Sequence, residues 1–73
     1  MTNIRDIIEY MVLLTSAFAR RFKISEAEAY RYLHRYGAIE LTYKYYDVMH
    51  TQSFEDMVQS LVTFCQRKGG TLL

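Results

Sequence analysis

The 73-residue sequence contains no proline, only three glycines and a single cysteine, Cys65. Without proline and with so little glycine, the chain lacks the turn signals that separate the short strands of a β-protein. One cysteine excludes a disulfide within the chain. A structural zinc site needs four ligands, and the chain offers one cysteine and two histidines, His34 and His50. We therefore expect a helical protein with no disulfide, no metal and no cofactor.

Strong charge of one sign and long hydrophobic runs are also missing. The formal net charge is +1 at pH 7, so the chain as a whole is not attracted to nucleic acid or to an acidic membrane. The longest apolar run, residues 11–14, is far shorter than the ~20 residues that span a membrane. The first residues do not have the pattern of a leader peptide. With the lone thiol, these features predict a cytoplasmic protein that does not contact membranes.

The length predicts one small domain, residues 1–73, in which residues 69–73 form a loose tail. A chain of about 60 residues buries only about 60% of the surface that its unfolded form exposes. Domains of this size often gain stability from disulfides, a metal or an oligomeric partner. Because the first two are not expected, self-association or a partner protein is predicted.

Three segments have apolar residues at the three-and-four spacing of an amphipathic helix. Thr2 or Asn3 is expected to cap the first, the pair Ser25 and Glu28 has capping-box spacing, and Ser53 is expected to cap the last. Gly37 and Gly69 are expected to end the second and last helices. The residues expected to face the core are Ile7, Ile8, Met11, Val12, Leu14, Ala17, Phe18 and Phe22, then Ala29, Tyr30, Leu33 and Tyr36, and finally Phe54, Met57, Val58, Leu61, Val62 and Cys65.

The segment 38–49, "AIELTYKYYDVM", is ambiguous, because tyrosine and valine in loose alternation also suit a strand. A lone strand would leave its backbone groups without hydrogen-bond partners. A short helix is therefore predicted here. The predicted fold is all-α, a compact bundle of three to four short helices.

The stretch "YDVMHTQSFEDMV" contains Asp47, His50 and Ser53, the side-chain types of a nucleophilic triad. Ser53 stands before a helix with Glu55 and Asp56 in its first turn, so its hydroxyl is expected to cap that helix. The two carboxylates would repel an oxyanion, and no nearby glycine allows a nucleophile turn. His50 is expected to donate to a backbone carbonyl or to Asp47, with a partner contact or a metal site shared with His34 as alternatives. We predict that the protein is not an enzyme.

Basic residues gather in "RRFKISEAEAYRYLHRYG", around a turn between two predicted helices. They could form a patch for nucleic acid in a helix-turn-helix-like arrangement. However, Glu26 and Glu28 stand at the start of the second helix, where they would face phosphate, and a solvated charged face is the more common outcome. Nucleic-acid binding is therefore the second choice, and its candidate residues are Arg20, Arg21, Lys23, Arg31 and Arg35.

Six of the seven tyrosines lie between positions 30 and 46, on too many faces of the predicted helices for all to be buried. Exposed tyrosine beside arginine is typical of protein interfaces. The alternative is a tyrosine-rich edge of the core with hydroxyls that reach water. The predicted interface residues are Tyr30, Tyr36, Tyr43, Tyr45, Tyr46 and His50.

The stretches "EAYRYL" (28–33), "YG" (36–37) and "YDVMHTQSFED" (46–56) resemble the bacterial domain of unknown function 3791. The resemblance extends from residue 7 to about residue 69, although "LTYKYY" is less aliphatic than expected. It implies a small helical domain encoded beside, or fused to, a domain similar to an ADP-ribosyltransferase-like toxin. An accessory or antitoxin-like role is implied in turn. We therefore expect a non-catalytic protein-interaction module whose partner is a second copy or a neighbouring gene product.

Overall fold

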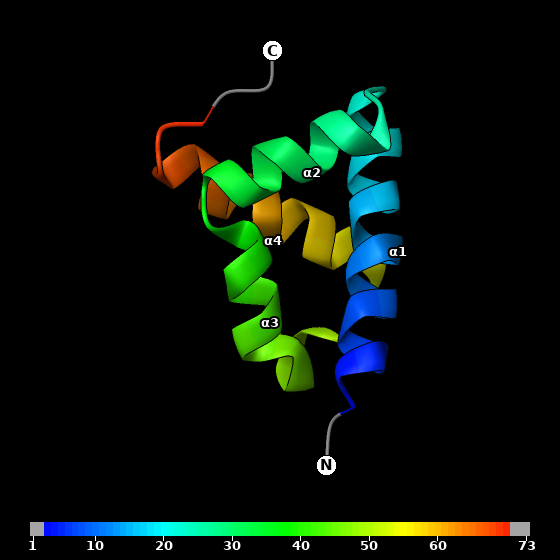
Figure 1. Cartoon of the computed structure of the whole chain (residues 1–73). Helices are drawn as coiled ribbons and strands as arrows, with labels where there is room; N and C mark the ends of the chain where they lie inside the picture. Colours follow the sequence, from blue (N-terminus) through cyan, green and yellow to red (C-terminus); the bar gives the residue numbers. More distant parts are fainter. Residues whose placement is uncertain (1–2, 71–73) are drawn as a thin grey trace.

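The computed structural model describes residues 3–70, which form four helices and no strand. The helices are α1 (Ile4–Phe22), α2 (Glu26–Arg35), α3 (Ala38–Met49) and α4 (Phe54–Arg67). Helices α1 and α3 run in opposite directions, α2 joins them across one end, and α4 crosses behind both (Figure 1). The predicted all-α bundle is confirmed, and the ambiguous third segment is a helix.

Side chains at the helix starts explain where the helices begin. Asn3 accepts a hydrogen bond from the amide of Arg5 (2.9 Å) and caps α1, while Thr2, the other candidate, lies outside the described residues. The Ser25 hydroxyl accepts from the Glu28 amide (3.0 Å), and the Glu28 carboxylate accepts from the Ser25 amide (3.1 Å). This capping box is the one predicted from the sequence, and its bonds lower the pKa of Glu28.

Left-handed residues end two of the helices. Gly37 has φ +82° and lies between α2 and α3, as its position in the sequence predicted. At the end of α1 the left-handed residue is Lys23, with φ +56°, and the next amide, of Ile24, donates to the carbonyl of Ala19 (3.0 Å). The sequence predicted a turn between the two helices here, but not a left-handed residue, because lysine carries a Cβ that disfavours this conformation.

The end of α4 is closed by the two glycines that were expected to begin a loose tail. Gly69 has φ +94°, its amide donates to Gln66, and the Gly70 amide donates to the carbonyl of Cys65 (2.9 Å). These paired bonds make a Schellman motif, and Gly70 itself is buried. Residues 71–73, the rest of the predicted tail, lie outside the described residues.

The core lies where the four helices meet. Phe18 stacks against Tyr32 and contacts Phe22, with ring centres 5.8 Å and 4.9 Å apart. Burial raises the pKa of the Cys65 thiol. The largest side chains that are almost completely buried are Leu14 and Phe18 from α1, Leu33 from α2, Thr42 from α3, and Leu61 and Cys65 from α4.

Four residues that the apolar pattern assigned to the core are exposed instead. Val12 is 57% exposed, Ile8 46%, Tyr30 45% and Phe54 38%. Consecutive residues of a helix point about 100° apart, so Val12 and Tyr30 turn away from the buried residues that directly precede them. The apolar stripe is wider than the strip that the neighbouring helices cover, so its edge remains at the surface.

Tyr10 shows the opposite error, because it is buried although the pattern did not assign it to the core. Its hydroxyl donates to the carbonyl of Met49 (3.1 Å), and its ring packs against Tyr46 and Phe54 at 5.3 and 5.4 Å. Burial, with Tyr46 nearby, raises the pKa of Tyr10. This contact ties the start of α1 to the end of α3.

Candidate protein interface

An apolar groove of about 450 Å³ opens between α1, α2 and α3. We call it the α1 groove. Its lining residues are Ile8, Met11, Val12 and Thr15 of α1, Glu26, Ala27 and Tyr30 of α2, and Tyr43 of α3. The buried Met11 and Thr15 form its inner part, and the exposed Ile8 and Val12 form one wall.

The groove gathers large apolar side chains that remain in contact with water. Tyr30 and Tyr43 are 45% and 41% exposed, on the α2 and α3 sides of the groove. Ile4, 64% exposed, precedes Ile8 and Val12 at four-residue intervals, so the three lie along one side of α1. We call these three residues the α1 ridge. Exposed apolar residues that gather in one place are a feature of many binding sites.

Polar contacts hold the α2 side of the groove in place. The Ser16 hydroxyl donates a hydrogen bond to the carboxylate of Glu26, which joins α1 to the first turn of α2. The Tyr30 ring stacks on the imidazole of His34, with centres 5.9 Å apart. Stacking on His34 already restricts the Tyr30 side chain, so binding a partner through Tyr30 costs little further conformational entropy.

A comparison with known protein families supports the resemblance seen in the sequence. A model described as "Protein of unknown function (DUF3791)" matches residues 9–68. The chain belongs to the DUF3791 family. The match includes every lining residue of the α1 groove except Ile8. Searches of curated proteins and of solved structures gave no match.

In this DUF3791 chain, the six predicted interface residues do not form one surface. Only Tyr30 and Tyr43 line the α1 groove. Tyr45 is 46% exposed, but it lines a smaller recess between α3 and α4. Tyr36 packs beside Tyr32, with ring centres 5.0 Å apart, near the end of α4.

The other two, Tyr46 and His50, pair with each other at the end of α3. Their rings stack at 4.5 Å, and the Nδ1 atom of His50 donates to the carbonyl of Tyr46 (2.7 Å). His50 therefore has the backbone-bonding role that was the first of its predicted roles. Within residues 3–70, no cluster of three His, Cys, Asp or Glu side chains could hold a metal ion.

Ser53 caps α4, as predicted: its hydroxyl accepts from the amide of Asp56 (3.1 Å). The hydroxyl is thus held against the helix start, and the imidazole of His50 is turned to the carbonyl of Tyr46.

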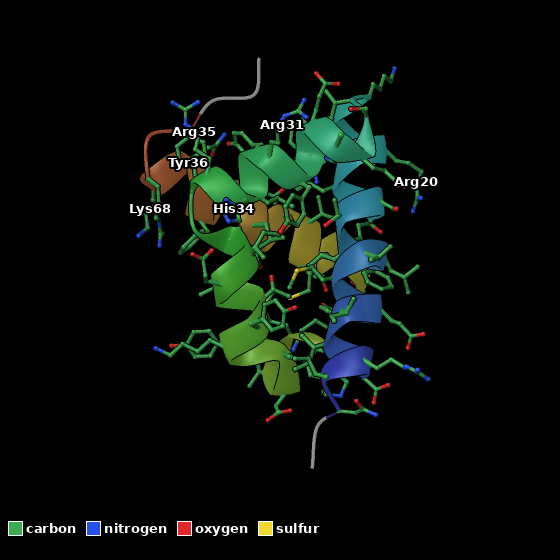
Figure 2. All side chains as sticks on the ribbon, in the orientation of Figure 1. Arg20, Arg31, His34, Arg35, Tyr36 and Lys68 are labelled. Atoms are coloured by element: carbon green, nitrogen blue, oxygen red, sulfur yellow. The ribbon has the colours of Figure 1, made fainter. Side chains whose placement is uncertain are left out.

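The predicted nucleic-acid residues lie in two places on the DUF3791 fold. Arg31 and Arg35 line one hollow along α2 with His34 and three tyrosines, whereas Arg20, Arg21 and Lys23 lie at the end of α1. Arg20 lies on α1 near one end of α2, whereas Arg35 lies at the other end of α2 (Figure 2). Arg21 donates to the side chain of Gln59 on α4 (2.9 Å), so it faces α4. Arg35 lies over the ring of Tyr36, 5.8 Å from its centre, and Arg31 lies between the two ends of α2.

The basic residues near helix ends have a local role. Arg20 and Arg21 lie in the last turn of α1, and Arg35 lies in the last turn of α2. Positive charge there offsets the negative end of the helix dipole.

Across the described residues, none of the four helices is long and apolar enough to cross a membrane.

Sequence reasoning found Tyr43 and assigned Tyr30 both to the core and to the interface, but it missed Ile8 and Val12, which it placed only in the core. The available signal was the width of the apolar pattern on α1, where Met11 and Val12 are adjacent. Adjacent apolar residues point in different directions, so at least one needs a second surface to cover it.

Proposed function

We propose that this DUF3791 domain is a non-catalytic protein-interaction module that binds its partner in the α1 groove. The observation that carries the proposal is the exposure of Ile8, Val12, Tyr30 and Tyr43 around one apolar groove. Covering apolar surface gains roughly 25 cal/mol per Å² removed from water, and tyrosine is enriched among the residues that dominate binding energy.

The apolar lining of the groove, from three helices, favours an amphipathic helical segment as the bound element. Helix-binding grooves take apolar side chains at three- and four-residue spacing, with the backbone of the bound helix satisfied internally. The family resemblance supports a neighbouring gene product as the first partner to test, in an accessory or antitoxin-like role. Nucleic-acid binding is less well supported, because Arg20 and Arg35 are at opposite ends of α2 and Arg21 is turned to Gln59.

Two adjacent exposed residues of α1 provide a matched test. Val12 is 57% exposed and lines the groove, whereas Leu13 is 56% exposed and does not. Val12→Glu should reduce the protein captured from extracts of the native cell at least about tenfold, because a carboxylate would be desolvated in the interface. Leu13→Glu should leave capture unchanged.

Captured protein and nucleic acid are quantified together, and both variants are checked for wild-type helical content. Equal capture by Val12→Glu and wild type would contradict the groove as the contact surface. Recovery of nucleic acid that declines steeply with salt would support the alternative instead.

A further inference from the structure

We propose that the occupant of the α1 groove is α1 of a second copy of the chain, in an antiparallel two-fold pair. This inference rests on the proposed function and names its partner. It requires the α1 ridge to be self-complementary, because a two-fold interface brings the same patch of each copy together.

The spacing of the ridge meets this requirement. Ile4, Ile8 and Val12 are exposed and lie four residues apart, so the ridge extends about 12 Å along the helix. A two-fold axis at the level of Ile7 interdigitates the two ridges: Ile4 of each copy lies between Ile8 and Val12 of the other, and the two Ile8 side chains are neighbours. Each ridge then covers the exposed wall of the other copy's groove.

The charges beside the ridge are complementary under the same symmetry. Arg5 and Glu9 each directly follow a ridge residue, so both lie on the same flank of α1, and both are exposed. In an antiparallel pair, equal flanks face each other. Arg5 of one copy therefore approaches Glu9 of the second, and the reciprocal pair forms at the other end. The basic Arg5 and the acidic Glu9 of one copy thus meet the opposite charges of the second copy.

The α2 side of the groove adds contacts that are already in place. Tyr30 is stacked on His34, and Glu26 is bonded to Ser16, so neither has to be ordered when the second copy arrives. Association would also supply the support that a domain of this size often obtains from an oligomeric partner.

A charge swap tests the pairing on the full chain. Sedimentation equilibrium over a wide concentration range should show a monomer–dimer equilibrium for the wild type. Glu9→Arg should weaken dimerisation about tenfold, because two opposite-charge pairs become like-charge pairs. The double variant Arg5→Glu/Glu9→Arg should restore it, and Val12→Glu should abolish it.

Each other outcome overturns the pairing. A wild-type chain that is monomeric at every concentration removes the second copy as occupant. If Val12→Glu still abolishes capture of a different protein, the groove remains the binding site for that partner. If Val12→Glu changes neither dimerisation nor capture, the proposed function fails as well. If Val12→Glu does not weaken the dimer, the dimer uses another surface. The same conclusion follows if Arg5→Glu/Glu9→Arg does not recover the dimerisation lost in Glu9→Arg.

Discussion

Replacement of Phe18 by alanine should destabilise the fold by about 3–5 kcal/mol, the range for a buried phenylalanine. Phe18 is completely buried and contacts Phe22 and Tyr32, so no side chain at the surface can fill the space that it leaves. Domains are typically stable by only about 5–15 kcal/mol, and a small one lies at the lower end. The variant should therefore be substantially unfolded near physiological temperature, as measured by urea titration of the helical circular dichroism.

Leu13→Ala is the matched control, because Leu13 is on the same helix and 56% exposed. It should change the unfolding free energy by no more than about 0.5 kcal/mol. A Phe18→Ala variant with a cost similar to that of Leu13→Ala would show that α1 does not pack as described.

Replacement of Gly70 by alanine should cost about 1–3 kcal/mol, the usual cost of adding volume to a packed site. A Cβ at Gly70 would lie 2.7 Å from the Tyr32 hydroxyl, 2.9 Å from the Tyr36 ring and 3.1 Å from the Cys65 carbonyl. Tyr32 cannot move freely, because its ring is stacked on Phe18. The predicted result is a lower melting temperature with the helical content of the folded state unchanged.

Tyr32→Phe provides the control for this clash, because it removes the nearest atom. The cost of Gly70→Ala should be smaller in the Tyr32→Phe background, as a double-mutant cycle would show. Equal costs in both backgrounds would mean that the clash does not involve the Tyr32 hydroxyl. An unchanged melting temperature would mean that residues 69–70 are as loose as the sequence alone indicated.

Local sequence signals predicted the helices of this chain well. A cap and its amide are only three residues apart in Ser25–Glu28 and Ser53–Asp56, so the pattern contains the whole interaction. The same holds for Gly37, whose left-handed conformation follows from the absence of a Cβ. These short-range rules explain why the element boundaries and the all-α class could be predicted.

The surface could not be predicted in the same way, because it depends on how far one helix covers another. Tyr10 is buried by a bond to Met49, 39 residues away, and no local pattern contains that contact. Val12 has the apolar character of a core residue but lies beyond the strip that α2 and α3 cover. The tyrosines were correctly expected to be partly exposed, but composition does not assign them to a common face.

The α1 groove as the contact surface is tested most directly by hydroxyl-radical footprinting of three tyrosines. Tyr30, Tyr43 and Tyr45 are 45%, 41% and 46% exposed, but only the first two line the groove. Their oxidation is compared between the dilute free chain and the assembled form, whether captured from extract or formed at high concentration. We expect protection of Tyr30 and Tyr43 with Tyr45 unchanged. Protection of Tyr45 alone, or equal oxidation of all three in both states, would contradict the assignment of the groove.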